Sequence, residues 1–296
     1  MKTAPLRKLV IVGVGLIGGS FARALRDLNL APRVVGMGRS RANLELAQQL
    51  GLIDEIAADY EQALKDAELV LVAAPVAQFA GVFEAIAPHL HADTIVTDAG
   101  STKQDVIAAA RTKFGSKLAH FVPAHPIAGT EHSGAGAARG DLYRERNVVL
   151  TPLPETDTAA VQRVDALWRA CGAQVHKMTA ERHDRIFAAV SHLPHVLAFA
   201  LVGELAARAD ADEFFRYAAG GFRDFTRIAS SSPEMWRDIC LANSDAIAAE
   251  LADYRVQLDR VAALLAARDG DGLAALFEQA RSARNAWLVR RGKEAE

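Results

Sequence analysis

The feature that most constrains this chain is a glycine pattern near its N-terminus. Gly13, Gly15 and Gly18 have the spacing G-x-G-x-x-G; they close a β-branched run that begins at Leu9 and open an amphipathic stretch. In that context the first glycine permits a tight turn, the second lets the backbone approach a pyrophosphate, and the third allows close helix–strand packing. The pattern predicts a helix N-terminus that binds dinucleotide phosphates, the alternative being a glycine-rich turn without ligand.

A secretory leader is an alternative for the same segment, because Lys2, Arg7 and Lys8 precede the apolar run. A leader does not require the glycine spacing, and the run continues directly into a helical pattern. Two cysteines, Cys171 and Cys240, form neither a disulfide framework nor a metal-ligand spacing. We therefore expect a cytoplasmic protein.

Length and charge exclude several other classes. The chain has 296 residues, enough for one large domain or two ordinary ones. Its 34 Lys and Arg residues nearly balance its 36 Asp and Glu residues, so neither nucleic acid nor another polyanion is an expected partner. The sequence contains no run of 18 consecutive apolar residues. Membrane insertion is therefore not expected.

The chain changes character near residue 179. Before it, β-branched runs alternate with amphipathic stretches, as in a parallel sheet covered by helices; beyond it, only helical patterns remain. We predict a Rossmann-type dinucleotide-binding domain at 1–179 and an all-α substrate and dimerisation domain at 180–296. The expected strands are Leu9–Gly13, Arg33–Met37, Leu69–Ala73, Thr94–Thr97, Leu118–Val122, Val148–Leu150 and Gln174–His176. The expected later helices are Glu181–Ala207, Asp210–Ala218, Pro233–Asn243, Ser244–Ala267 and Gly272–Val289.

Apolar residues recur at helical spacing on the long helix expected at Ser244–Ala267. Such a stripe either closes the core of its own domain or is buried against a second copy of the chain. We predict a homodimer. The residues of the stripe are Leu251, Leu258, Val261, Leu264 and Leu265.

The end of the second expected strand favours NADP over NAD. An NAD-preferring site usually places an acid there for the ribose 2′-hydroxyl, but the sequence has Gly38, Arg39, Ser40 and Arg41. The two arginines and the serine can bind a 2′-phosphate, the alternative being a solvated turn and NAD binding without the acidic contact. The expected cofactor-binding residues are Gly13, Gly15, Leu16, Ile17, Gly18, Arg39, Ser40, Arg41, Ala74, Pro75 and Ser101.

Two polar patches follow strands of the first domain. Ser101 comes directly after a strand, at the carboxyl end of the sheet where open α/β folds bind ligands, and it can also be the N-cap of the next helix. His125 precedes Pro126 in a loop after another strand, a position suited to acid–base or hydrogen-bonding work. The alternative for His125 is a merely solvated loop histidine.

A third patch lies in the helical half. Ser191 and His195 are four apart and share a helix face, while Asp224 and Arg227, three apart, can share another. The alternative is a set of buried hydrogen-bonded side chains that join helices. The nine histidines have no accompanying H-E-x-x-H, C-x-x-C or clustered carboxylate spacing, so no metal site is expected.

In order along the chain, these motifs resemble the prephenate and arogenate dehydrogenases of tyrosine biosynthesis, also called cyclohexadienyl dehydrogenases. The resemblance implies a Rossmann domain, a helical dimerisation domain and an NAD(P)-dependent enzyme. It implies oxidative decarboxylation of prephenate to 4-hydroxyphenylpyruvate or of arogenate to tyrosine. The motifs that carry it are Gly13–Ser20, Asp98–Lys103, His125–Glu131, Ser191–His195 and Gly220–Arg227.

The resemblance also implies roles for single residues. His125 is similar to the histidine that hydrogen-bonds the 4-hydroxyl group as hydride leaves, and Ser101 would orient His125 and contact the nicotinamide. Arg227 resembles the arginine that binds a substrate carboxylate, and Asp224 would hold that arginine. Trp236 has the spacing at which some members send an aromatic toward the neighbouring subunit's site. The implied substrate-binding residues are His195, Ser191, Thr130, Glu131, Gly220 and Trp236.

Two other functions are compatible with this domain order. A β-hydroxyacid-type dehydrogenase requires a catalytic lysine on a helix of the second domain, but after Lys177 the sequence contains only Lys293. A non-catalytic NADP-sensing module would bind cofactor without turnover. A sensor needs no hydride-transfer pocket, so the presence of residues suited to such a pocket disfavours this function. These residues are Ser101, His125 and Arg227.

Overall fold

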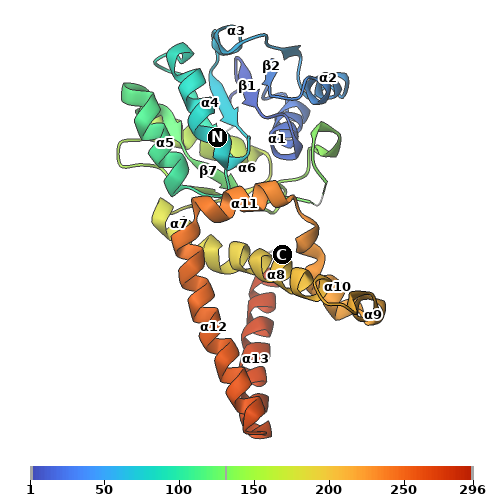
Figure 1. Cartoon of the computed structure of the whole chain (residues 1–296). Helices are drawn as coiled ribbons and strands as arrows, with labels where there is room; N and C mark the ends of the chain where they lie inside the picture. The colour runs from blue at the N-terminus through green and yellow to red at the C-terminus, as the bar shows by residue number, and fades with distance from the viewer. Residues whose placement is uncertain (1–2, 131, 295–296) are drawn as a thin grey trace. The chain divides into compact units, whose positions relative to one another are not determined.

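The computed structural model describes residues 3–130 and 132–294 (Figure 1). These residues form two compact units, one that ends at Ser244 and one that begins at Asp245. The first unit contains both sheets and the helices up to residue 242. The domain boundary expected at residue 179 stays a prediction.

A six-stranded parallel sheet forms the centre of the first unit, with the strand order β3-β2-β1-β4-β5-β6. From β1, the strands β2 and β3 are added on one side of the sheet, and β4, β5 and β6 on the other. The point between β1 and β4 is therefore the topological switch point, at which open α/β sheets bind ligands. The predicted Rossmann-type fold is confirmed. The strands are β1 (Leu9–Val12), β2 (Val34–Met37), β3 (Glu55–Ile56), β4 (Leu69–Val72), β5 (Ile95–Asp98) and β6 (Phe121–Val122).

Helices cover both faces of this sheet. Alternate residues of β1 point to opposite faces, and all of them are apolar and buried, so each face needs a layer of helices. Leu9 and Ile11 join one apolar core, in which Phe21 of α1 contacts Trp168 of α6 at 4.5 Å between ring centroids. Val10 and Val12 join the other core, which includes aromatic residues of α4 and α5. The helices are α1 (Leu16–Asp27), α2 (Arg41–Gln49), α3 (Tyr60–Leu64), α4 (Phe79–Ile86), α5 (Gln104–Phe114) and α6 (Thr158–Ala170).

A second sheet corrects the prediction of one continuous parallel sheet. It joins β7 (Ala124–Pro126), β8 (Asn147–Leu150) and β9 (Gln174–Lys177), and β7 pairs with β8 in antiparallel fashion. Pro123 separates β6 from β7; it lacks an N–H for the ladder, so the chain leaves the first sheet there. His125 therefore lies on a short strand, not in the expected loop.

The stretch expected as one helix at Glu181–Ala207 consists of α7 (Ala180–Phe187), a π-helical turn (Ala188–His192) and α8 (Leu193–Ala206). Pro194 is the second residue of α8 and lacks the N–H of a regular helical bond. π-Helical turns are frequent at functional sites. The unit then continues through α9 (Ala211–Tyr217), α10 (Gly220–Thr226), which the sequence did not predict as a helix, and α11 (Pro233–Ala242).

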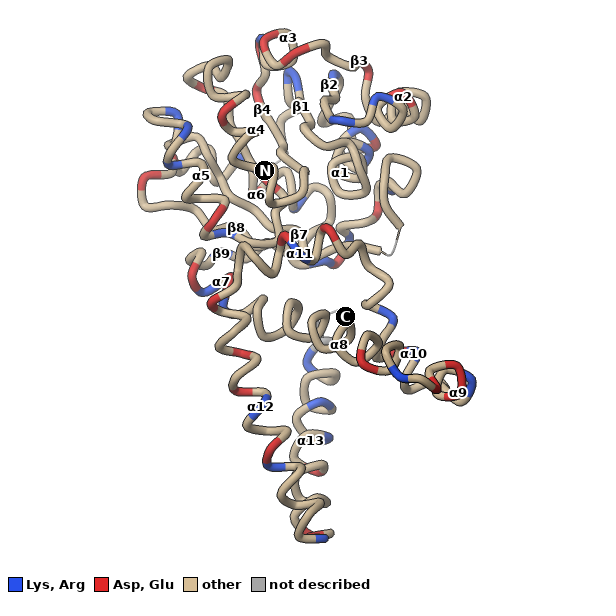
Figure 2. Tube along the Cα trace, in the orientation of Figure 1, with Lys and Arg blue, Asp and Glu red and all other residues tan. Residues whose placement is uncertain are grey.

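Apolar surface is exposed on several helices. By length and composition, the stretch Ala180–Ala206 could cross a membrane, and α8 buries only Leu193 and Ala198. Figure 2 shows α8 as an almost uncharged segment, whereas elsewhere both signs of charge are interspersed. The expectation that the protein does not enter a membrane stays a prediction.

The second unit contains α12 (Ser244–Ala266) from Asp245 onward and α13 (Gly270–Glu294). Arg268, with a φ of 51°, forms the turn between them. Leu258 and Leu265 of the predicted stripe are 50% and 59% exposed, and Phe277 is 58% exposed. The stripe is therefore not fully buried by the described residues of its own chain.

Candidate active site

The glycine turn leaves space for a ligand where its sequence pattern predicts one. Gly13 has a φ of +99°, and a Cβ atom there would lie 2.5 Å from the Ala73 carbonyl oxygen. A Cβ on Gly18 would lie 2.4 Å from the Gly13 oxygen, whereas one on Gly15 would meet nothing within 4 Å. Helix α1 has no side-chain cap at Gly15, which leaves its first N–H groups free to bind phosphate.

The remaining expected cofactor residues divide into two groups. Leu16 and Ile17 begin α1, and Ala74 lies beside the Gly13 turn, followed by the exposed Pro75. On the other side of β1, Ser40 caps α2 by accepting a hydrogen bond from the Asn43 N–H, and Arg41 pairs with Glu45 at 2.8 Å.

Arg39 is exposed, and within residues 3–130 and 132–294 no acidic partner is found for it. Of the three residues expected to bind a 2′-phosphate, Arg39 is thus the one without a competing contact.

A chain of three hydrogen-bonded side chains lies beyond the carboxyl ends of β5 and β6. His125 Nδ1 lies 2.8 Å from His183 Nε2, and His183 Nδ1 lies 2.8 Å from Asp184 Oδ1. Asp184 also accepts hydrogen bonds from the backbone N–H groups of Lys103 and Gln104, each at 2.9 Å. The ring of Phe187 packs against both histidines. We call His125, His183 and Asp184 the histidine chain.

The hydrogen bonds assign the tautomers of the histidine chain. A carboxylate only accepts, so His183 donates its Nδ1–H to Asp184 and its Nε2 accepts from His125. His125 therefore carries its proton on Nδ1, and its Nε2 has a free lone pair. Burial, and then the charges of His183, Lys103 and His192, lower the pKa of His125 well below 6.5. His125 is thus a neutral hydrogen-bond acceptor near pH 7.

Asp98 and Lys103 form a buried ion pair beside the histidine chain. Asp98, at the end of β5, accepts from the Ala124 N–H at 3.0 Å and from the Gly100 N–H at 2.8 Å. Lys103 Nζ donates to the Ala124 carbonyl oxygen at 2.9 Å. Ser101 lies between these two residues and is partly buried, but the described partner of His125 is His183. Ser101 is therefore not the described partner of His125 Nδ1, and the expectation that Ser101 orients His125 stays a prediction.

His195 and Ser191 lie close together, as their spacing predicts. His195 Nδ1 lies 2.9 Å from the Ser191 carbonyl oxygen, so the contact uses the backbone and not the hydroxyl. Burial lowers the pKa of His195, and the charge of Arg227 lowers it further. Arg227 thus acts electrostatically on His195, although its own side chain is exposed at the end of α10.

Trp236 stacks on His195 of its own chain, with ring centroids 3.6 Å apart and planes 20° apart. It is 8% exposed, and its buried indole N–H has no protein partner among the described residues. The expectation that Trp236 reaches toward a neighbouring subunit's site stays a prediction.

The remaining expected residues lie farther from these contacts. Asp224 is exposed and pairs with Arg223 at 3.6 Å, so it does not hold Arg227 as expected. Gly220 begins α10, and Thr130 follows β7 in an exposed position. Glu131 lies outside the described residues.

Sequence analysis missed five residues of this region: His183, Asp184, Lys103, His192 and Asn243. Asn243 Nδ2 donates to the Asp184 carbonyl oxygen at 2.9 Å and contacts His192 Nδ1 at 3.2 Å. His183, Asp184 and Phe187 are the buried residues of α7, so the available signal was two adjacent polar residues beside the apolar Phe187, which lies four positions from His183 on the same helix face. Burial also lowers the pKa of His192 to about 4.

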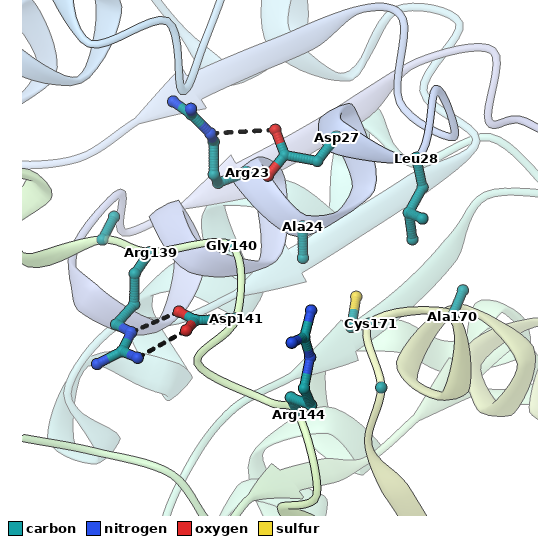
Figure 3. A pocket seen from close by; sticks show the side chains of 12 residues that line it. Arg23, Ala24, Asp27, Leu28, Arg139, Gly140, Asp141, Arg144, Ala170 and Cys171 are labelled. Carbon is teal, nitrogen blue, oxygen red and sulfur yellow. Dashed lines mark hydrogen bonds and ion pairs between the residues drawn. The ribbon is translucent and has the colours of Figure 1, made fainter.

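A separate cavity of about 510 Å³ lies beside α1 (Figure 3). Arg23 pairs with Asp27 there, and Arg139 pairs with Asp141. None of the expected site residues lines this cavity. Among the described residues, no group of three or more His, Cys, Asp or Glu side chains could hold a metal ion.

Comparison with known proteins gives the same family for both halves of the chain. Residues 21–177 match the family model "Prephenate dehydrogenase, nucleotide-binding domain", and residues 179–279 match "Prephenate dehydrogenase, dimerization domain". A cyclohexadienyl dehydrogenase of Zymomonas mobilis is 36% identical over 280 residues, which cover 94% of this chain and 95% of the relative. A prephenate dehydrogenase of Bacillus subtilis is 35% identical over 95% of this chain and 76% of its own.

A solved structure is also similar over nearly the whole chain. The prephenate dehydrogenase of Aquifex aeolicus, in complex with hydroxyphenyl propionate and NAD+, superposes with a TM-score of 0.90 at 34% identity. The match covers 96% of this chain and 99% of that one.

Proposed function

Because the chain belongs to the prephenate dehydrogenase family, we propose that it is an NAD(P)-dependent dehydrogenase of tyrosine biosynthesis. It oxidatively decarboxylates prephenate to 4-hydroxyphenylpyruvate, arogenate to tyrosine, or both. The observation that carries this proposal is the histidine chain, which leaves the lone pair of His125 Nε2 free beyond the carboxyl end of β6.

The glycine turn fits the cofactor. The open space at Gly15 and the uncapped N–H groups of α1 are suited to the pyrophosphate, and Ala74 borders the same turn. When bound, the nicotinamide supplies the acceptor for the hydride. The protein residues then have to bind and orient the substrate ring and to manage the proton of its hydroxyl group.

His125 accepts a hydrogen bond from the hydroxyl on the ring carbon that loses hydride. That hydroxyl becomes acidic as hydride leaves, so a neutral acceptor favours the transition state more than the ground state. The bond to the ring carboxylate breaks, carbon dioxide departs and its electron pair completes the aromatic ring. The hydroxyl proton stays with the phenol product, so His125 ends in its starting protonation state.

Arg227 binds a carboxylate of the substrate, supported by its electrostatic effect on His195 and by the absence of an acidic partner among the described residues. We expect Arg227→Ala to raise the substrate KM about 10-fold or more and to change kcat less, because a charged hydrogen bond contributes about 1.5–3 kcal/mol. Initial rates over a range of substrate concentrations measure both. Arg223→Ala is the matched control, since Arg223 already pairs with Asp224. An unchanged KM in Arg227→Ala would refute the carboxylate role.

NADP is proposed as the preferred cofactor. The proposal is supported by the lack of an acid at residues 38–41, after β2, and by Arg39, for which the described part of the chain offers no acidic partner. We expect Arg39→Ala to lower kcat/KM for NADP+ about 10-fold while leaving kcat/KM for NAD+ nearly unchanged, because only NADP+ has the 2′-phosphate. Arg33→Ala, which removes an exposed arginine paired with Glu55 that is not an expected cofactor residue, is the control. A strong NAD+ preference of the unaltered enzyme would contradict this proposal.

A homodimer located in the cytoplasm is also proposed. The family model over residues 179–279 describes a dimerisation domain, and α8 and α12 leave apolar side chains exposed in the single chain. Sedimentation of the purified chain without detergent tests this. A monomer, or a chain that is recovered only with membranes, would contradict it.

The experiment that tests the function as a whole uses the purified chain with prephenate and arogenate, each combined with NAD+ and NADP+. Absorbance of the reduced nicotinamide reports turnover. Cofactor binding without turnover of either substrate would favour the nucleotide-sensing alternative.

A further inference from the structure

The buried ion pair between Lys103 and Asp98 has no role in the mechanism described so far. Both side chains are 0% exposed. Burying two charges is costly, and a buried pair is often no more stabilising than apolar residues of the same size. Stability alone is therefore a weak explanation for this pair, which makes its contacts informative.

At one end, the pair holds the residue that precedes His125. Asp98 Oδ1 accepts from the Ala124 N–H, and Lys103 Nζ donates to the Ala124 carbonyl oxygen. Both backbone polar groups of Ala124 are thus fixed by charged side chains. This is the point at which the chain passes from the first sheet to the second, so the pair sets where β7 and its histidine begin.

At the other end, Lys103 holds the acid of the histidine chain. Its backbone N–H donates to Asp184 Oδ1 at 2.9 Å. The same oxygen accepts from His183 Nδ1. One residue therefore contacts Asp184 through its backbone and the strand of His125 through its side chain.

We infer that Lys103, together with Asp98, is a positioning residue that keeps His125 and Asp184 at the two ends of one hydrogen-bonded chain. The inference rests on the proposed role of His125. Lys103 does not touch the reacting atoms; it acts on the reaction through His125.

The charge of Lys103 gives the inference a second readout. The charged and titratable groups that act on His125 are His183, Lys103 and His192, and Asp184 and Asp105 act in turn on His183. Lys103 lowers the pKa of both histidines. Removing its charge raises the pKa of His125. Neutral His125 is the active form, so kcat/KM falls in acid solution as His125 is protonated. We call this fall the acid limb of the pH profile, and a higher pKa of His125 moves it to higher pH.

The test is the double variant Asp98→Asn/Lys103→Met. It removes both charges at nearly constant volume, and the asparagine oxygen can still accept from the Ala124 N–H. Changing Lys103 alone would leave a buried carboxylate without its cation. Lys113→Met is the matched control, because Lys113 lies on α5, the helix that Lys103 precedes, and pairs with Glu84 near the surface.

We expect the folded double variant to bind NAD(P)+ normally and to lose about 10-fold or more in kcat, since small displacements of a catalytic group have large effects. Its acid limb should lie at higher pH than that of the unaltered enzyme. NMR titration of His125 in the cofactor-free protein should show the same direction. A folded double variant with unaltered kcat and unaltered titration of His125 would overturn the inference.

If the double variant does not fold, Asp98→Asn/Lys103→Gln replaces it, since the glutamine amide keeps a donor and no buried carboxylate is left without its cation. An acid limb at higher pH supports the inference, and an unmoved limb overturns it. The NMR titration needs no turnover. Failure of the unaltered enzyme to oxidise either substrate would therefore refute the proposed function while leaving this inference testable.

Discussion

His125→Asn is expected to lower kcat by at least about 10²-fold with NAD(P)+ binding intact, which is the usual range for loss of a general acid or base. Asparagine is polar and of similar length, but it lacks a ring nitrogen with a lone pair at the position of Nε2. The cofactor turn around Gly15 belongs to different elements, α1 and the end of β1, and should not change. Single-turnover hydride transfer and cofactor titration measure the two effects separately.

His132→Asn is the control for this variant, because His132 is exposed in the following loop and lies outside the histidine chain. We expect it to have the kcat of the unaltered enzyme. Full turnover in His125→Asn would remove His125 from the mechanism.

The lowered pKa of His125 also predicts the pH profile of the unaltered enzyme. Burial favours the neutral ring, so protonation requires a pH well below the ordinary value of 6.5. Because the neutral form is active, kcat/KM should stay high below pH 6.5 and fall only in more acid solution. An acid limb at or above pH 6.5 would contradict the burial argument.

The sequence predicts the parts of this site that local patterns encode. The spacing of Gly13, Gly15 and Gly18 specifies a strand, turn and helix through residues that are neighbours in the chain, and the structure has all three. The spacing of Ser191 and His195 likewise predicts a shared helix face, and the two residues are in contact. Rules of this kind need no knowledge of the tertiary fold.

What the sequence does not predict depends on long-range pairing. His183 meets His125 across 58 positions, and Lys103 meets Asp184 across 81. No spacing rule connects such residues, because their proximity is set by the packing of α7 on the sheet edge. Strand β3 has only two residues and gives no periodicity to detect.

Asp224, Arg227 and Trp236 also show that spacing along the chain does not predict which residues are in contact. Asp224 and Arg227 have a helical spacing, yet α10 ends at Thr226 and Asp224 pairs with Arg223. Trp236 was expected near a neighbouring subunit from its spacing past Arg227, but that spacing does not predict its contact with His195 of α8 in its own chain. Sequence distance specifies a face only while the helix continues, and it does not specify which element packs on that face.

Asp184→Asn is the second change expected to have a large effect, lowering kcat by roughly 10²–10⁴-fold. The substitution changes the tautomers of His183 and His125, and does not only remove the charge of Asp184. If the asparagine amide group donates to His183 Nδ1, then His183 must carry its proton on Nε2, which would face His125 Nδ1. His125 would then be protonated on Nε2, and its free lone pair would no longer face the substrate.

The wrong tautomer should make the single-turnover rate of Asp184→Asn low at every pH. Loss of Asp184 lowers the pKa of His183, because the carboxylate raises it in the unaltered protein. Both histidines therefore stay neutral, and raising the pH cannot restore activity, since the proton lies on the wrong nitrogen of an already neutral ring. Single-turnover rates from acid to alkaline pH, with Glu181→Gln as an exposed acid-to-amide control on the same helix, measure this. Recovery of the Asp184→Asn rate at high pH would show that Asp184 acts on protonation and not on the tautomer.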